Sequence, residues 1–287
     1  MPEGHTIHAL AERLTRRFAG APVTVDSPQG RFAREAALLD GREMIGADAA
    51  GKHLFVTFEG DAVVHVHLGL IGSFEVHPHP EDAAPPAVGA VRLRLLNPTY
   101  VADLRGPNLC ELGTAQTVAG VLARLGPDPL RAGADPDAAW AKISRSGRSI
   151  AELLMDQSVV AGVGNVYRCE VLHARRVDPF RPGREIKPSA WRAIWSDLVT
   201  WLPLGVRYNQ ILTLSSQVND AIARYDDPEV RAAHEAHTGR RLGTAYERSF
   251  AVYKRTGEPC LTCGSRVRAH TVAGRVLYWC GRCQRRR

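Results

Sequence analysis

No run of apolar residues in this 287-residue chain approaches the roughly 20 that a bilayer-spanning helix needs. This absence excludes a protein held in a membrane by helices. The chain also lacks internal repeats and low-complexity tracts, which excludes a solenoid and a largely disordered polypeptide. What remains is an ordinary globular composition, 45% hydrophobic and 23% charged, with length for two domains or for one large and one small domain.

Cysteine is scarce, with six residues in the chain, and four of them form two C-x-x-C pairs near the C-terminus. The pairs are Cys260 with Cys263 and Cys280 with Cys283. Their spacing is typical of a zinc ribbon, in which four thiolates surround one Zn²⁺. Two disulfides are the alternative, but no N-terminal signal segment points to an oxidising compartment, which favours zinc. We expect the other two thiols, Cys110 and Cys169, to be reduced and buried.

The segment between the two pairs has the pattern of a β-hairpin. Residues 266–272 alternate, Ala273-Gly274 can form a turn, and residues 276–279 are β-prone and aromatic. Arg275 follows the turn, so we expect it at an exposed hairpin tip. Because cysteine fills all four ligand positions, the predicted zinc is structural and has no open position for chemistry.

Positive charge is concentrated in this same C-terminal segment. Residues 240–287 contain eleven Arg and one Lys against two Glu, a net charge of +10. The whole chain carries +7, so the remaining residues together carry −3. A basic excess on a metal-stabilised fold favours a binder of polyanions such as nucleic acid, with a solvated basic tail as the alternative.

The N-terminal part of the chain is predicted to be one helix followed by a β domain. Apolar residues recur at helical spacing over residues 7–18, and Gly20 can end that helix. Short β-prone runs separated by turns then occupy residues 23–112, which indicates a two-sheet sandwich or a barrel.

Beyond residue 113 the pattern becomes helical. Helices are expected over residues 118–125, 140–143 and 188–225. A capping box that starts at Ser149 predicts a helix running through Val159, and Asn165 is predicted as the N-cap of the next helix, 166–175. The glycine-rich turn between these two helices suits phosphate binding, because free N–H groups there can approach a phosphate closely. An ordinary helical hairpin is the alternative, and the basic ribbon favours DNA.

Two His-x-His pairs raise the question of a second metal site. They are His65 with His67 and His77 with His79. Residues i and i+2 of a strand share one face. However, no carboxylate or third ligand is evident near them in the sequence, so we do not expect a metal at either pair.

The N-terminus offers a candidate nucleophile. Removal of Met1 would leave Pro2 at the start of the chain, with a secondary amine. An α-amino group titrates near pH ~8, against ~10.4 for Lys, so much more of it is neutral and nucleophilic at pH 7. Its attack on a sugar aldehyde carbon gives an iminium directly, and Glu3 could shuttle protons. Most Met-Pro starts carry no chemistry, so these residues alone leave the question open.

Several motifs, in order along the chain, resemble those of one family. They are Met-Pro-Glu-Gly at 1–4, Gly-Lys-His at 51–53, Leu-Gly-Pro-Asp-Pro at 125–129, Asp-Gln at 156–157, Val-Ala-Gly-Val-Gly-Asn-Val-Tyr at 160–167, and Glu-Pro-Cys at 258–260. With the ribbon, they make nearly the whole chain resemble the formamidopyrimidine-DNA glycosylase and endonuclease VIII family of bifunctional base-excision enzymes. Pro-Glu-Gly rather than Pro-Glu-Leu favours the endonuclease VIII branch, whose members prefer oxidised pyrimidines.

The resemblance implies an α+β multidomain fold. Its expected parts are an N-terminal catalytic β-sandwich domain over residues 1–114, a helical domain with a helix–two-turn–helix over 115–245, and a zinc finger over 246–287. It also implies one structural Zn²⁺ and a glycosylase that cleaves the strand by β,δ-elimination. The expected partner is double-stranded DNA with oxidised bases or abasic sites, bound by a monomeric, cytoplasmic, nucleoid-associated protein.

The resemblance also implies roles for individual residues. Pro2 matches the Schiff-base nucleophile, Glu3 the general acid/base, and Lys52 a pocket lysine that contacts DNA phosphate. Asn165 and Arg275 match residues that hold the phosphates flanking the flipped lesion.

Further residues are expected to contact the DNA at the emptied stack. Leu70 and Ile71 fall where the family inserts side chains, and unstacking a base costs a few kcal/mol, least for a damaged one. Arg105 is expected to contact DNA, although residues 103–107 lack the Phe that the purine-directed branch inserts opposite the lesion.

A second departure concerns the acid groups, because Thr6 replaces the family's usual second acid, for which His5 or His8 could substitute. Two alternatives stay open. One is a purine-directed glycosylase of the same fold, and the other is a non-catalytic zinc-ribbon protein that binds DNA.

Overall fold

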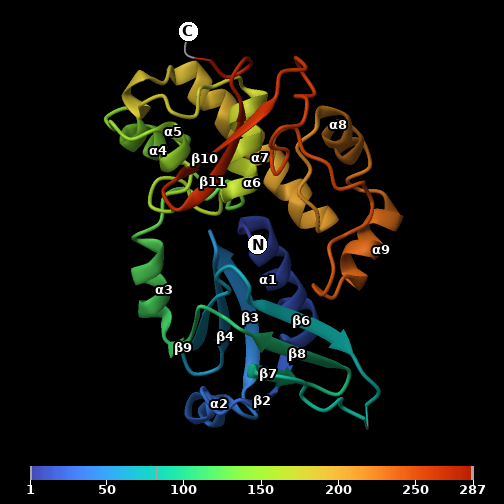
Figure 1. Ribbon diagram of the computed structural model, residues 1–287. Helices are drawn as coiled ribbons and strands as arrows, with labels where there is room; N and C mark the ends of the chain where they lie inside the picture. The colour runs from blue at the N-terminus through green and yellow to red at the C-terminus, as the bar shows by residue number, and fades with distance from the viewer. Residues whose placement is uncertain (1, 82, 286–287) are drawn as a thin grey trace. The chain divides into compact units, whose positions relative to one another are not determined.

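The computed structural model describes residues 2–81 and 83–285, which divide into two compact units (Figure 1). The first unit contains the residues up to 124 together with 232–242, and the second contains 125–231 and the residues from 243 onward. Within the described residues, no helix is both long and apolar enough to cross a bilayer. The three-domain division expected at residues 114 and 245 stays a prediction.

The first unit is built from helix α1 (Gly4–Phe18) and two antiparallel sheets. The sheet orders are β1-β3-β4-β5-β9 and β2-β7-β8-β6. The strands are β1 (Ala21–Pro22), β2 (Thr24–Asp26), β3 (Glu43–Ala50), β4 (His53–Phe58), β5 (Ala62–His67), β6 (Ser73–Pro78), β7 (Val91–Leu96), β8 (Tyr100–Arg105) and β9 (Leu109–Gly113). Buried side chains from α1 and both sheets form one hydrophobic core, so the predicted β-sandwich is confirmed.

Helices make up most of the second unit, again as predicted. The remaining helices of the chain are α2 (Ala33–Leu39), α3 (Ala115–Leu122), α4 (Pro136–Ile143), α5 (Ile150–Leu153), α6 (Asn165–Ala174), a 3₁₀ turn η1 (Gly183–Glu185), α7 (Pro188–Tyr208), α8 (Ser215–Ala223) and α9 (Pro228–Ala236). Helices α4 to α8 share one hydrophobic core with the C-terminal hairpin. Its largest fully buried side chain is Trp191 of α7.

The helix predicted to run from the capping box through Val159 is much shorter in the structure. The capping box of Ser149 and Glu152 is confirmed, but α5 ends at Leu153. The carboxylate of Asp156 accepts hydrogen bonds from the backbone N–H of Ser158 at 3.0 Å and from its hydroxyl at 2.7 Å. Such local side-chain bonds compete with the helical ladder, so the chain turns here instead.

Two further helix boundaries differ from the predictions. Asn165 is not an N-cap, because Gly164 holds that position in an extended conformation and Asn165 is the first residue of α6. The helical stretch expected over 188–225 is interrupted after α7, because Asn209 adopts a left-handed conformation with φ +50° and ends the helix.

The C-terminal hairpin has the predicted strands and turn, although Arg275, expected to be exposed, is half-buried. Strands β10 (Val267–Val272) and β11 (Arg275–Cys280) pair in antiparallel register, with Val272 opposite Arg275. The connecting residues Ala273 and Gly274 have φ +48° and +72°. Two consecutive positive φ values are the mark of a type I′ turn, whose twist matches that of the paired strands.

Candidate active site and zinc centre

The start of α1 carries the predicted nucleophile and acid. Pro2 is half-buried, and Glu3, which directly precedes the helix, is fully buried. A carboxylate at a helix N-terminus is stabilised by the partial positive charge of the N–H groups there. The sequence therefore puts a prolyl nitrogen and a buried carboxylate on adjacent residues. The prediction that Met1 is removed concerns a residue outside the described part of the chain.

His5 is the nearest candidate to replace the missing second acid. Its ring is buried, and burial lowers the pKa of His5 to about 3. Its Nε2 lies 3.3 Å from the hydroxyl of Thr6. Burial therefore favours the neutral form of this imidazole, and the possible substitution of His5 for the acid stays a prediction.

Lys52 lies in the tight turn between β3 and β4. The residue before it, Gly51, has φ +59°, a left-handed conformation that glycine adopts without strain. The Lys52 side chain is half-buried.

No carboxylate or third ligand is evident near His65 in the sequence, but the fold places a carboxylate and a further histidine beside it. His65 Nδ1 is 2.9 Å from Glu111 Oε1, and His65 Nε2 is 2.9 Å from His53 Nδ1. These residues meet because β5 pairs with β4 on one side and with β9 on the other. Burial, together with the adjacent His65 and His67, lowers the pKa of His53 to about 4.

The second His-x-His pair contacts one carboxylate and two backbone carbonyl groups. His77 Nε2 lies 3.4 Å from Glu75, and His79 bonds the carbonyl oxygens of Pro80 at 2.6 Å and Asn97 at 3.0 Å.

Leu70 and Ile71 lie on a loop that exposes them to solvent. Ile71 is 90% exposed and Leu70 is 48% exposed. The loop is closed by a 3.1 Å hydrogen bond from the N–H of Gly72 to the carbonyl of Leu68. A Cβ at position 72 would lie only 2.4 Å from that carbonyl oxygen, so glycine is required there. Exposed apolar side chains on a tightly closed loop are consistent with the predicted insertion of Leu70 and Ile71 between DNA bases.

Arg105, at the end of β8, is held in place by its neighbours. Its Nη2 donates to Asp103 Oδ2 at 2.8 Å and its Nε to the Val88 carbonyl at 3.0 Å. Arg94 donates to both oxygens of the same carboxylate, at 2.7 and 2.9 Å, and this hydrogen bonding raises the pKa of Arg94. The fixed guanidinium of Arg105 can present only its remaining N–H groups to a ligand.

Asn165 is directly connected to the hairpin that carries Arg275. Its Nδ2 donates to the carbonyl of Val276, the residue after Arg275, at 2.8 Å. Its Oδ1 accepts a hydrogen bond from Nη2 of Arg168, whose side chain is fully buried. The structure thus places Asn165 against β11, the strand that begins at Arg275, although Asn165 and Arg275 are far apart in sequence.

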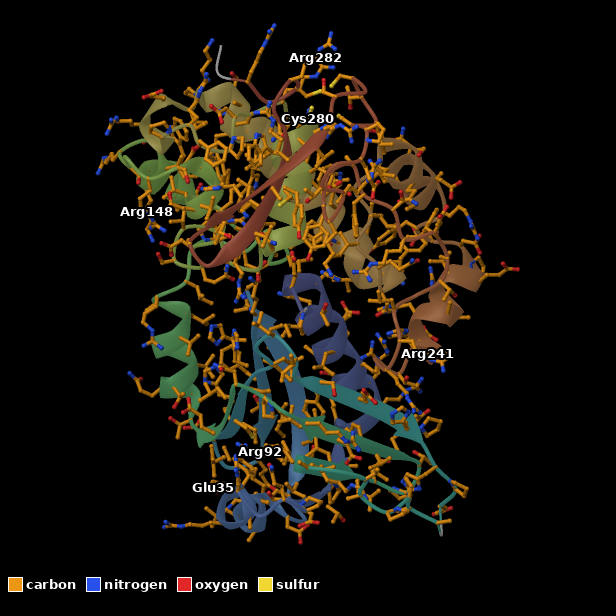
Figure 2. All side chains as sticks on the ribbon, viewed as in Figure 1. Glu35, Arg92, Arg148, Arg241, Cys280 and Arg282 are labelled. Atoms are coloured by element: carbon orange, nitrogen blue, oxygen red, sulfur yellow. The ribbon has the colours of Figure 1, made fainter. Side chains whose placement is uncertain are left out.

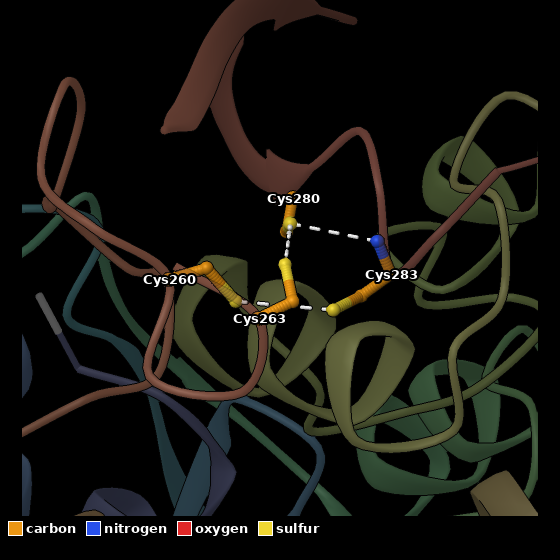
Figure 3. A group of neighbouring side chains, drawn as sticks. All are labelled: Cys260, Cys263, Cys280 and Cys283. Atoms are coloured by element: carbon orange, nitrogen blue, oxygen red, sulfur yellow. Dashed lines mark hydrogen bonds between the residues drawn. The ribbon is translucent and has the colours of Figure 1, made fainter. Parts of the chain in front are cut away.

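The four C-terminal cysteines form one cluster of sulfur donors (Figure 3). All four Sγ atoms lie within 4.8 Å of one another, with Cys260 to Cys283 at 3.9 Å and Cys263 to Cys280 at 3.5 Å. Four thiolates ~2.3 Å from a central Zn²⁺ would be about 3.8 Å apart, so the site fits zinc. The same distances are far too long for the disulfide alternative, which needs about 2.0 Å. The protein binds one zinc, and a complete set of cysteine ligands makes it structural.

Exposed arginines surround the zinc ribbon. Arg266, Arg268 and Arg282 are all exposed, and Figure 2 shows Arg282 close to Cys280 at the end of the hairpin. Arg148 is also exposed in the same unit, where it pairs with Asp156 at 2.7 Å (Figure 2). The ribbon therefore presents several guanidinium groups to solvent, as a phosphate-binding surface requires.

Comparison with known proteins agrees with this architecture. Three family models match in order: the formamidopyrimidine-DNA glycosylase N-terminal domain over residues 1–107, its H2TH domain over 125–216, and the zinc finger found in FPG and IleRS over 257–286. Endonuclease 8 1 of Mycobacterium tuberculosis is 46% identical over 285 residues, which cover 99% of this chain and 100% of that protein. The chain belongs to the formamidopyrimidine-DNA glycosylase family.

More distant members of the formamidopyrimidine-DNA glycosylase family also match over their whole length. The Thermus thermophilus formamidopyrimidine-DNA glycosylase is 30% identical over 99% of this chain and 98% of that protein. The crystal structure of that organism's protein aligns with a TM-score of 0.74 at 28% identity, over 99% of this chain and 98% of the other. The Lactococcus lactis enzyme, in a complex with abasic-site DNA, has the same fold, with a TM-score of 0.76 at 20% identity over 99% and 100% of the two chains.

Membership of the formamidopyrimidine-DNA glycosylase family makes this protein an enzyme, a DNA glycosylase of the class that also has abasic-site lyase activity. The roles of its individual residues stay predictions. The first unit holds Pro2, Glu3, Lys52, Leu70, Ile71 and Arg105, and the second holds Asn165, Arg275 and the zinc ligands.

Several polar contacts in the structure were not predicted from the sequence. The His53–His65–Glu111 chain depends on strand pairing and has no local signal. In contrast, the four-residue spacing of Asn165, Cys169 and His173 on a predicted helix could have revealed a shared face.

Proposed function

We propose that this glycosylase, acting as a monomer, removes oxidised bases, mainly pyrimidines, from double-stranded DNA and then cleaves the strand. The observation that carries the proposal is a fully buried Glu3 directly after Pro2, at the start of α1. The pyrimidine preference is supported by the greater identity to a protein named Endonuclease 8 1, 46%, than to one named formamidopyrimidine-DNA glycosylase, 30%. The absence of a Phe in residues 103–107 agrees with it.

The proposed chemistry uses the amine of Pro2 once Met1 is removed. The amine attacks C1′ of the damaged nucleotide, the bond to the base breaks, and Glu3 in its acid form donates a proton to the departing fragment. The amine proton passes to the Glu3 carboxylate, which then protonates O4′ as the C1′–O4′ bond breaks, and the opened sugar is left as an iminium on Pro2. Loss of a C2′ proton then breaks the C3′–O bond, a second elimination breaks the C5′–O bond, and water releases Pro2.

DNA contacts are assigned to both units. Lys52, Asn165 and Arg275 contact phosphates, and Ile71 with Leu70 enters the space left by the flipped base. Because the flanking phosphates are bound, the sugar is held next to Pro2. The reaction then takes place between two groups that are already in position, which lowers its entropic cost.

Borohydride trapping tests the proposal. Borohydride reduces the iminium to an amine, so enzyme and lesion DNA become covalently linked. We expect a crosslink with oxidised-pyrimidine duplexes and abasic DNA, partial activity for Pro2→Gly through its primary amine, and none for an N-terminally acylated protein. Glu3→Gln should lose base release but still cleave abasic DNA.

Two results would contradict the proposal in different ways. Efficient trapping on 8-oxoguanine duplexes with little on oxidised pyrimidines would favour the purine-directed alternative. No crosslink with any lesion, together with tight DNA binding, would favour the non-catalytic zinc-ribbon protein.

A further inference from the structure

One face of α6 makes three hydrogen-bonded contacts with the zinc ribbon. The residues are Asn165, Cys169 and His173, which are spaced four apart and so follow one another along the helix. Asn165 Nδ2 donates to the carbonyl of Val276 at 2.8 Å, and the backbone N–H of Tyr278 donates to Cys169 Sγ at 3.4 Å. His173 Nε2 lies 3.4 Å from Sγ of the zinc ligand Cys260.

The contact of His173 with Cys260 has a definite direction when zinc is bound. A zinc-bound cysteine is a thiolate and can only accept, so Nε2 of His173 must carry the proton and donate it. A Zn²⁺ with four thiolates has a net charge of −2, and an N–H group directed at a sulfur reduces the repulsion among the ligands. His173 is buried, as is Cys260, and a charge-assisted bond is stronger where water is excluded.

At the other end of the same face of α6, two hydrogen bonds orient the side chain of Asn165. Its Oδ1 accepts from Arg168, and one hydrogen of its Nδ2 goes to Val276. An amide nitrogen has two hydrogens, so the second is available to a DNA phosphate at the N-terminus of α6. The carbonyl of Val276 belongs to β11, the strand that ends at the zinc ligand Cys280. The direction of the Asn165 amide therefore depends on where β11 lies against α6.

We propose that His173 is a positioning residue for the zinc centre, and that α6 transmits zinc binding to the amide of Asn165. The transmission rests on the proposed function, because that function assigns Asn165 to a phosphate. Zinc then has two effects in this protein: it folds the hairpin, and it fixes the hairpin against the helix that holds DNA.

Two substitutions of His173 distinguish the effect of its hydrogen bond from the effect of its packing. His173→Phe keeps a buried ring but has no N–H donor, whereas His173→Gln keeps an N–H at about the position of Nε2. With full-length zinc-loaded protein and an excess of a chromogenic chelator, we expect His173→Phe to release zinc about 10- to 100-fold faster than wild type. His173→Gln should stay within about threefold of wild type. Equal release from His173→Phe and wild type would overturn the assignment, and so would equally fast release from both variants.

A measurement on the unsubstituted protein does not depend on the folding of any variant. With ¹¹³Cd in place of zinc, an N–H···S bond should give a scalar coupling between the metal and the Nε2 proton of His173. A merely space-filling ring would show no such coupling, and its absence in a well-resolved spectrum would contradict the proposal.

Measurements of DNA binding test whether α6 transmits the effect of zinc binding to Asn165. We expect His173→Phe to weaken duplex binding about threefold to tenfold and to flatten the salt dependence of log K by up to about 0.9, as for one lost phosphate contact. In an Asn165→Ala background the same substitution should have little further effect. Equal weakening in both backgrounds would refute the transmission. If Asn165→Ala itself leaves DNA binding unchanged, the proposed phosphate role fails, while the zinc-release result still decides the role of His173.

Discussion

The carboxylate of Glu170 accepts a hydrogen bond of 2.9 Å from the backbone N–H of Val252, 82 residues later in the chain. The same carboxylate accepts from the N–H groups of Ala251 at 2.7 Å and Tyr253 at 2.9 Å, and from the Thr213 hydroxyl at 3.0 Å. Glu170 is 1% exposed. The buried side chain of Glu170 thus links α6 by hydrogen bonds to residues 251–253, which precede the zinc ribbon.

Glu170→Ala should strongly destabilise the second unit, because it leaves several buried N–H groups without an acceptor. Each unsatisfied group costs ~1–3 kcal/mol, and the costs are not fully additive, so we expect a loss of about 3–5 kcal/mol in the free energy of unfolding. Urea unfolding followed by tryptophan fluorescence measures this. The matched control is Glu229→Ala, an exposed acid of α9, which should change stability by no more than ~0.5 kcal/mol. A loss below about 1 kcal/mol for Glu170→Ala would contradict the role.

His5 should make the protein less stable as the pH falls. Its folded pKa is about 3, below the ordinary value near 6.5, because burial disfavours the charged ring. The unfolded chain therefore binds a proton that the folded chain does not, so stability is present above pH 6.5 and is lost as the pH falls toward 3. One such group contributes a slope of ~1.4 kcal/mol per pH unit.

Urea unfolding between pH 7.5 and 4.5 tests this, with His5→Phe as the variant. The variant should show a shallower loss of stability on acidification. His53 and His237, whose pKa values burial also lowers to about 4, act in the same direction and keep some slope in the variant. Identical slopes for the two proteins would show that His5 does not titrate as stated.

Ile71→Ala should impair base removal without affecting the fold. The side chain is 90% exposed, so its truncation should change the free energy of unfolding by no more than ~0.5 kcal/mol. If Ile71 replaces the flipped base, excision from an oxidised-pyrimidine duplex should slow by about tenfold, whereas cleavage of a preformed abasic site should change little, since less unstacking is required. Single-turnover kinetics measure both. Ile45→Ala, which truncates another exposed isoleucine on β3, should alter neither rate.

Arg275→Lys should lose more activity than its retained charge suggests. A guanidinium can hold a phosphate through two parallel N–H groups in a fixed geometry, which an ammonium cannot do. Arg275→Ala and Lys52→Ala should each flatten the salt dependence of log K by about one unit, equally for all DNA sequences. Arg192→Ala, which removes an exposed arginine from α7, serves as the charge control. Unchanged rate and salt slope in Arg275→Ala would remove Arg275 from the phosphate contacts.

Features that depend only on neighbouring residues could be predicted from the amino-acid sequence. Two C-x-x-C pairs, a glycine turn between alternating strands and a Ser149–Glu152 capping box each act within a few residues, so their patterns survive in any tertiary context. The ordered motifs of the whole chain were also sufficient to identify the family.

Which polar groups act together could not be predicted from the sequence, because it depends on the tertiary fold. Asn165 looked like a helix cap, but its amide bonds Arg168 and the distant Val276 instead. His65 meets Glu111 because their strands pair, 46 residues apart. Such partners are chosen by burial, since a polar group taken out of water must find whatever donor or acceptor the fold brings to it, however far away it lies in the chain.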